Sequence, residues 1–174
     1  MRVMTLEIRR LTAEDAEPYH ALRMRTLTEH PEAFVITPEE EANVEETRAR
    51  LARTEACDDE LIFGAWDGSD LFGTAGMYRQ TPNRVRGRHR AMIWGMYVVP
   101  EARGNGTGRR LLDAAINAAR HAEGIELIHL GVAPESGPAR SLYRSAGFEP
   151  WGIEAKSSRV DGRYIDTEMM VLFL

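Results

Sequence analysis

The chain has 174 residues, a length typical of one domain, and we expect residues 1–174 to form a single domain. Its 43% hydrophobic and 28% charged residues exclude a disordered or collagen-like chain. No run approaches the roughly 18 apolar residues of a membrane helix, and Glu7 interrupts the segment in which a secretion signal would be apolar. One cysteine, Cys57, excludes a disulfide framework and a cysteine-only metal site. We therefore expect a cytoplasmic protein without a membrane partner.

The charged residues are unevenly distributed along the chain. The net charge of −5 disfavours non-specific binding to nucleic acid. Residues 29–60 contain eleven acids and three arginines, whereas residues 79–90 contain five arginines and no acid. Two interpretations stay open. In the first, both segments are solvated surface. In the second, residues 29–60 attract a positively charged substrate and residues 79–90 form a basic edge for a cofactor or partner.

Hydrophobic periodicity and capping residues predict the secondary structure. Thr12 with Asp15, and Thr37 with Pro38 and Glu40, are typical of helix starts. The expected helices cover residues 12–30, 37–53, the segment from a glycine-rich loop to Gly124, and 136–146. The expected strands cover residues 6–9, 61–66, 71–79, 91–99, 127–132, 148–155 and 163–174. Gly95 interrupts the strand at 91–99 and indicates a β-bulge.

The order of these elements predicts the fold class. Hairpins alternate with one strand–helix–strand unit, so an α/β (α+β) fold is expected. It has a mixed, mostly antiparallel sheet of about seven strands, flanked by about four helices.

The most informative segment joins a strand to a helix through the loop at residues 103–108, Arg-Gly-Asn-Gly-Thr-Gly. Such a loop directs backbone N–H groups and the positive end of a helix at one point, which suits a phosphate. A Walker loop requires lysine, which is absent here. The dinucleotide pattern G-x-G-x-x-G begins at Gly104 but fails at Arg109. The pattern R-x-x-G-x-G fits completely.

A second motif follows at residues 136–148. Its residues are similar to the pattern N-x-x-A-x-x-L-Y-x-x-x-G-F, which they match at Ala139, Leu142, Tyr143, Gly147 and Phe148. With the glycine loop and the element order, this resembles the GNAT superfamily of acyl-CoA-dependent N-acetyltransferases over essentially the whole chain. The resemblance implies a splayed central sheet and a single N-acetyltransferase domain.

The resemblance also implies roles for individual residues. Met96, Tyr97 and Val98 would bind the pantetheine arm of acetyl-CoA through their backbone, like an added strand. The pyrophosphate would be held by backbone amides of Arg103, Gly104, Asn105, Gly106, Thr107, Gly108 and Arg109. Ser136 would contact pantetheine, and Tyr143 would act as the general acid that protonates the departing thiolate. The acetyl group would pass by direct attack to a primary amine of a small molecule or a protein, without a metal.

Three departures from the family pattern affect these expectations. Ser136 replaces an asparagine, although its hydroxyl can still cap the following helix, and Thr107 replaces an aliphatic residue. The general base is the larger gap. The strand at 91–99 carries no acid, and Gly131 stands where some members have glutamate. The base is therefore relayed through water or supplied from elsewhere, with His129, Glu154 and Asp166 as candidates.

Other readings of the chain remain open. A non-catalytic acyl-CoA-binding sensor or assembly module is the alternative function, and a nucleic-acid role for residues 79–90 is a distant third. Phe34, Val35 and Ile36 are either core residues or one wall of the acceptor site. The five histidines lack the spacing of metal ligands. The apolar strand at 169–174 could pair across a homodimer.

Overall fold

The computed structural model describes residues 6–174. Residues 1–5, where the segment assessed as a secretion signal begins, lie outside the described residues. The strands are β1 (Glu7–Arg10), β2 (Glu60–Asp67), β3 (Asp70–Arg79), β4 (Arg90–Val98), β5 (Leu127–Val132), β6 (Glu149–Val160) and β7 (Arg163–Phe173). The α-helices are α1 (Ala16–Glu29), α2 (Val44–Glu55), α3 (Thr107–His121) and α4 (Gly137–Ser145).

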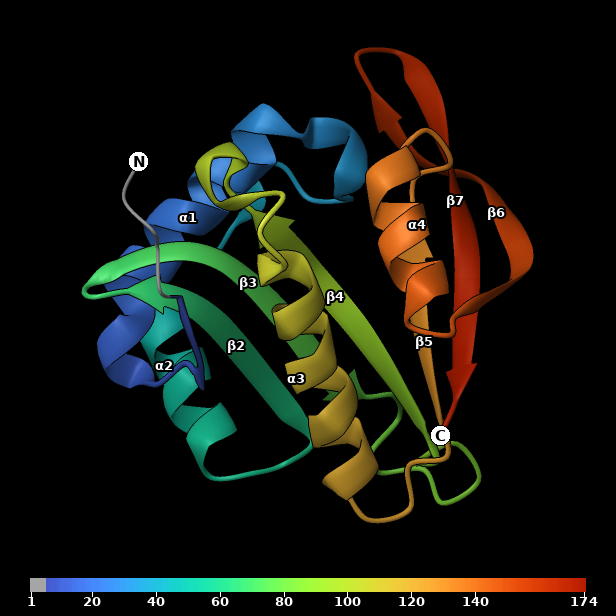
Figure 1. The fold of residues 1–174 in the computed structure, drawn as a ribbon, viewed down its shortest axis with the longest axis horizontal. Coiled ribbons are helices and arrows are strands. Elements are labelled where there is room, and N and C mark those ends of the chain that lie inside the picture. Colours follow the sequence, from blue (N-terminus) through green and yellow to red (C-terminus); the bar gives the residue numbers. More distant parts are fainter. Residues whose placement is uncertain (1–5) are drawn as a thin grey trace.

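The strands form one seven-stranded sheet in the order β1-β2-β3-β4-β5-β7-β6. The β4–β5 pair is parallel and the other pairs are antiparallel, so the expected mixed and mostly antiparallel sheet is confirmed. The helices α3 and α4 cover one face of the sheet, and α1 and α2 cover the other (Figure 1). Among residues 6–174, no helix is both long enough and apolar enough to cross a bilayer.

Strand alternation separates the core into two layers. Leu61 packs with the apolar stripe of α3, whereas its neighbour Ile62 packs with α1 and α2 on the opposite face. The buried stripe of α3 consists of Leu111, Leu112, Ala115, Ile116 and Ala119. This stripe fixes α3 across β2, β3 and β4, and thereby fixes the glycine loop that precedes it.

The sheet opens between β4 and β5. These strands pair only from Arg90–Met92 to Leu127–His129 and then separate. Gly95 has a φ of +61°, and two β4 residues oppose one β3 residue between the pairs Thr74–Tyr97 and Gly76–Trp94. The bulge expected at Gly95 is therefore confirmed, and it bends β4 away from β5. The splay leaves backbone groups of β4 without a strand partner on the β5 side.

The start of α2 and the cap of α4 differ from the sequence-based expectation. Thr37 begins only a 3-10 turn, Pro38–Glu40, because Glu41 is extended at φ −69° and ψ 141°. α2 begins six residues after the expected position because Asn43 and Glu46 form a capping box, with both hydrogen bonds at 3.0 Å. Ser136 precedes α4 but makes no side-chain capping bond. Its expected capping role was therefore wrong.

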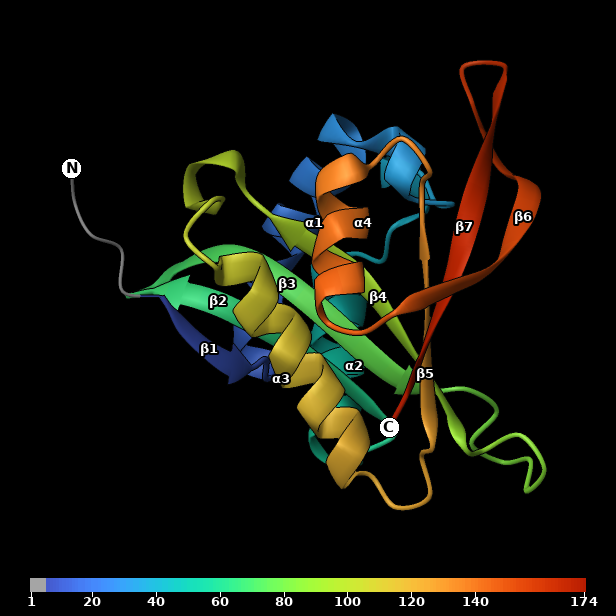
Figure 2. The ribbon, with the colours of Figure 1, turned by 45° about the vertical axis from the view of Figure 1, so that its right-hand side comes forward.

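The β6–β7 hairpin rises above the rest of the sheet (Figure 2). β7 pairs with β5 from Glu168 to Phe173, and it pairs with β6 only as far as Val171. Pairing of the segment at 169–174 across a homodimer stays a prediction. The two edge strands of the sheet are β1 and β6, because β7 is paired with β5 on one side and with β6 on the other.

Candidate active site

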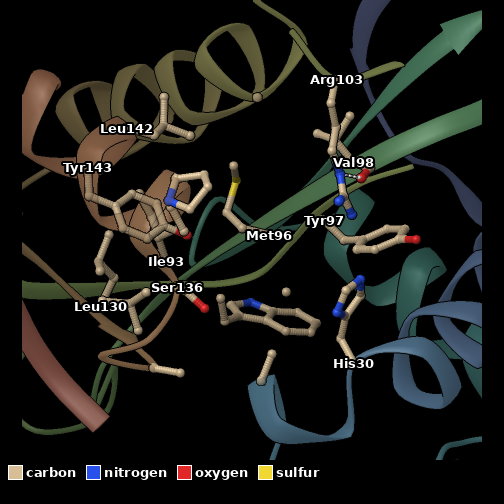
Figure 3. A pocket seen from close by; sticks show the side chains of 18 of the residues that line it. His30, Ile93, Met96, Tyr97, Val98, Arg103, Leu130, Ser136, Leu142 and Tyr143 are labelled. Atoms are coloured by element: carbon tan, nitrogen blue, oxygen red, sulfur yellow. Dashed lines mark hydrogen bonds between the residues drawn. The ribbon is translucent and has the colours of Figure 1, made fainter. Parts of the chain in front are cut away.

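A cavity of about 660 Å³ occupies the splay between β4 and β5. Its walls are the bulged half of β4, the glycine loop with the start of α3, the end of β5, the inner side of α4 and the connection after α1. Tyr143 and Ser136 lie on one side of the cavity, Tyr97 and His30 lie on the other, and Met96 lies between them (Figure 3). The fold thus brings the expected pantetheine, pyrophosphate and general-acid residues to one cavity, apart from Asn105, which does not line it.

The β4 wall carries the expected pantetheine residues, Met96, Tyr97 and Val98. The carbonyl of Val98 accepts a hydrogen bond of 2.8 Å from Nε of Arg103 (Figure 3). The Arg103 guanidinium lies 5.7 Å from the Tyr97 ring centroid. The Arg103 side chain therefore folds back along β4, and the backbone carbonyl of Val98 already has one donor.

The glycine loop leads directly into the start of α3. Gly104 and Gly106 have φ of +77° and +85°, a region that favours glycine. The first bond of α3 runs from the amide of Arg110 to the carbonyl of Gly106 at 3.0 Å, so the amides of Gly108 and Arg109 precede the helical ladder. Two exposed donors and the helix dipole suit a phosphate.

Three loop residues have more specific positions than the sequence indicated. Oδ1 of Asn105 accepts from the amide of Thr107 at 3.2 Å and also bonds the Thr107 hydroxyl. The Thr107 amide therefore has a partner within the loop. The Arg109 side chain pairs with Asp113 at 2.9 Å and bonds the carbonyl of Ser145 at 3.2 Å. The Arg109 side chain therefore links α3 to α4.

Tyr143 lies on the α4 wall of the cavity and is 6% exposed. Its ring packs edge-on against Phe148, with centroids 6.1 Å apart. Burial raises the pKa of the Tyr143 phenol to about 12. The phenol therefore keeps its proton throughout the neutral range, as a proton donor must.

The three candidates for the general base lie outside this cavity. His129 stacks near Trp151 at 5.7 Å, and burial, followed by the charge of Arg90, lowers its pKa. Asp166 accepts from the amide of Lys156 at 2.8 Å within the β6–β7 hairpin, and Glu154 is exposed on β6. None of the three is a lining residue, and their proposed role gains no support.

Gly131 does line the cavity, and it has no room for a glutamate. A Cβ built on Gly131 would lie 2.7 Å from Cγ2 of Thr167. The carboxylate that some family members carry at this position is thus excluded by β7 in the present packing.

The connection between α1 and α2 supplies residues that sequence reasoning identified only in part. Phe34 lines the cavity, whereas Val35 is 77% exposed, so the expected apolar wall consists of Phe34. His30 and Glu32 also line the cavity, with Nδ1 of His30 3.3 Å from Oε1 of Glu32. In the sequence, His30-Pro31-Glu32 directly after a helix is the local signal for this pair.

The acidic residues of the segment 29–60 are mostly engaged in local structure. Glu29 accepts from the Tyr97 hydroxyl at 2.7 Å, and the hydrogen bond from Arg25 contributes most to lowering the pKa of Glu29. Glu41 and Glu60 pair with arginines, and Glu46 caps α2. Within residues 6–174, no group of histidines, cysteines and carboxylates is arranged to hold a metal.

Solved acetyltransferases share the overall fold of this chain. A GNAT-family acetyltransferase from Streptococcus pneumoniae superimposes with a TM-score of 0.87 at 21% identity, covering 97% of this chain and 99% of that one. A ribosomal-protein-alanine N-acetyltransferase from Brucella melitensis superimposes with a TM-score of 0.82 at 25% identity, covering 97% of this chain and all of that one. The fold is that of an acetyltransferase.

The model of the acetyltransferase (GNAT) family matches residues 14–148, so this chain belongs to that family. The chain is 31% identical over 145 residues to mycothiol acetyltransferase of Beutenbergia cavernae. The aligned residues cover 83% of this chain and 45% of that protein. It is 35% identical over 101 residues to the N-alpha-acetyltransferase RimI of Mycobacterium tuberculosis, covering 57% and 58% of the two chains. The chain thus spans about half the length of these relatives.

Proposed function

We propose that this protein transfers the acetyl group of acetyl-CoA to a primary amine. The observation that carries the proposal is the convergence of free amides at the start of α3 and the buried Tyr143 on one cavity in the splayed sheet. Membership of the GNAT family and the named acetyltransferase relatives support the same activity.

The cavity fits acetyl-CoA as a cosubstrate. A Cβ built on Gly104 or Gly106 would meet no atom within 4 Å, so the approach to the loop is open. The amides of Gly108 and Arg109 suit the pyrophosphate, and the unpaired edge of β4 at Met96 suits the pantetheine arm. The cosubstrate supplies an activated acyl group.

The transfer proceeds by direct attack of the unprotonated amine on the thioester carbonyl. The C–N bond forms, the C–S bond breaks, and the thiolate leaves with the electron pair. Tyr143 protonates that thiolate, since its phenol lines the cavity and is protonated at neutral pH. The amine must lose a proton on the other side of the reacting carbon.

We assign the receipt of that proton to His30, directly or through water. His30 lies across the cavity from Tyr143, and Glu32 can orient its ring from 3.3 Å (Figure 3). The position of an imidazole with a carboxylate neighbour is typical of a general base. This assignment replaces the candidates His129, Glu154 and Asp166, which lie outside the cavity.

The acceptor class, the oligomeric state and the location are also proposals. The relatives' names include a spermidine N(1)-acetyltransferase of Vibrio cholerae and the N-alpha-acetyltransferase RimI, so both small molecules and proteins are considered as acceptors. The exposed edge strand β6, with Trp151 at 58% and Ile153 at 57% exposure, supports a homodimer. A single exposed cysteine supports a cytoplasmic location.

The alternative function, a non-catalytic acyl-CoA-binding module, is favoured by one observation. β4 carries no acid, and the base candidates expected from the sequence do not line the cavity. The two functions share cofactor binding and differ only in turnover.

Two measurements separate these functions. A thermal melt with acetyl-CoA tests binding: ligand at 100 times its dissociation constant stabilises the fold by about 2.7 kcal/mol. A free-thiol release assay against amines, polyamines, amino acids, aminoglycosides and peptides tests transfer. Binding without thiol release on any amine would support the module, and no shift of the melt at millimolar acetyl-CoA would refute both.

A further inference from the structure

Arg23 is a buried cation whose hydrogen bonds are incomplete. It lies on α1 and is 6% exposed. Its Nε and Nη2 both donate to Oε2 of Glu41, at 3.0 and 2.9 Å. Its Nη1 is buried and has no acceptor among residues 6–174. A guanidinium carries five donors, and a buried donor without an acceptor is unfavourable.

The free Nη1 lies next to the cavity at the bulge of β4. A Cβ built on Gly95 would meet nothing nearer than Nη1 of Arg23, at 4.0 Å. Gly95 itself lines the cavity. Nη1 therefore lies directly behind the bulge, within van der Waals reach of a side chain at position 95, and Gly95 places no side chain between Nη1 and the cavity.

Aromatic side chains frame the same guanidinium. The Phe34 and Trp94 rings lie 5.1 and 5.9 Å from the guanidinium carbon, and both residues line the cavity. Packing of an arginine against Trp94 does not by itself leave a guanidinium N–H without an acceptor. Arg50 lies 4.5 Å from the Trp94 ring, yet its Nε and Nη2 both bond Glu60 and none of its nitrogens is buried without a partner.

We propose that Nη1 of Arg23 donates a hydrogen bond to a carboxylate or amide carbonyl oxygen of the acceptor. The acceptor is then an amine that carries such an oxygen close to the reacting nitrogen, as in an amino acid or at a peptide N-terminus. This inference rests on the proposed function, because it names the acceptor of the same cavity. Glu41 offsets the charge of Arg23, so the hydrogen bond, rather than net charge, provides the selection.

Matched acceptors test the inference. For phenylalanine, leucine and glutamate, the free acid, its C1 carboxamide and the amine lacking that carboxyl group are compared, with kcat/KM expressed per concentration of free amine. Both oxygen-bearing forms should exceed the third by tenfold or more, as expected for a hydrogen bond to a charged group. A preference for the acid or for the carboxamide distinguishes an amino acid from a peptide terminus.

Variants assign this preference to Arg23. Arg23→Gln should reduce the ratio of kcat/KM between the oxygen-bearing acceptors and the amine without the carboxyl group to threefold or less. The change should arise mainly in KM, with acetyl-CoA affinity unchanged. Arg23→Lys should retain part of this ratio. Arg50→Gln, next to the same Trp94, is the matched control and should retain the full preference. Equal losses on all three forms would indicate a merely structural role and would overturn the inference.

A binding measurement keeps the test decisive if Arg23→Gln does not fold. With CoA present, the wild-type protein should bind N-acetylphenylalanine at least tenfold more tightly than N-acetylphenethylamine by calorimetry. Equal binding, or transfer to amines without any oxygen preference, overturns the inference and leaves the proposed function intact. The proposed function fails separately if no amine in the panel releases thiol, whatever the outcome of the calorimetry.

Discussion

Arg140 on α4 and Glu168 on β7 form a two-point ion pair, with Nε–Oε2 at 2.8 Å and Nη2–Oε1 at 3.0 Å. The Glu168 side chain is only 9% exposed. Tyr143 follows Arg140 by three residues, almost one helical turn, so this ion pair holds the turn that carries the proposed acid. The hydrogen bond from Arg140 is the main cause that lowers the pKa of Glu168.

Arg140→Met should lower the melting temperature, because it removes the main partner of the Glu168 carboxylate, whose side chain is 9% exposed. A carboxyl with a depressed pKa contributes stability above its unfolded pKa of about 4.3, and that contribution is lost as pH falls through the folded value. The difference in melting temperature between wild type and variant should therefore shrink below about pH 4. The control is Arg144→Met, because that guanidinium is 4.0 Å from Glu168 and 53% exposed. An equal loss in both variants would contradict the assignment.

Tyr143→Phe should lower kcat by about 10²–10⁴-fold, the usual contribution of general acid catalysis. The ring remains against Phe148, so stability and acetyl-CoA affinity should change little. Turnover and calorimetry on the two proteins check this expectation. Tyr164→Phe, an exposed position on β7, is the control. Turnover of the Tyr143 variant within threefold of wild type would remove Tyr143 from the mechanism.

The rate of transfer should also not decline between pH 8 and pH 10. Burial raises the pKa of Tyr143 to about 12, so its acid form is lost only as pH rises through that value. The amine, by contrast, becomes more reactive as it loses its proton. A pH profile of kcat on an identified amine checks this. A fall in kcat near pH 10 that is absent in Tyr143→Phe would show that the pKa of Tyr143 is not raised, and would contradict the prediction.

Gly106→Val should abolish the stabilisation by acetyl-CoA. Gly106 has a φ of +85°, which valine adopts only with strain, and a Cβ built on it meets no protein atom within 4 Å. A valine side chain would therefore not clash with the protein, but it would strain the loop backbone and block the approach of the ligand. The matched control is Gly124→Val, which has a φ of +74° and equally open space but does not line the cavity. Thermal melts with and without ligand compare them. The control should lose stability but keep its ligand shift, and a retained shift in Gly106→Val would count against the loop.

His30→Gln should lower kcat by about 10²-fold or more if the imidazole receives the amine proton. Acetyl-CoA affinity should persist, because the loop amides are unchanged. His121→Gln is the control, since His121 lies at the exposed end of α3 and bonds the carbonyl of Asn117 at 2.7 Å. Steady-state kinetics on one amine compare the three proteins. Unchanged turnover in His30→Gln would assign the proton to water.

The sequence by itself determined the elements whose signals are local. The apolar stripe from Leu111 to Ala119 predicted an amphipathic helix, and Gly95 predicted a bulge in its strand. The loop from Arg103 to Gly108 required a strand-to-helix turn with free amides. Each of these features depends on residues close together in the sequence. The spacing of apolar residues and the positions of glycines, which tolerate positive φ and carry no side chain, therefore predict them.

The tertiary structure decided which residues meet. α2 starts after Asn43 and not after Thr37. The base candidates on β5, β6 and β7 do not line the cavity, whereas His30 does. Arg23 meets Glu41 and the bulge at Gly95 only because α1 packs across the sheet. Such contacts join residues distant in sequence, and their energies depend on burial and partner geometry that local patterns do not encode.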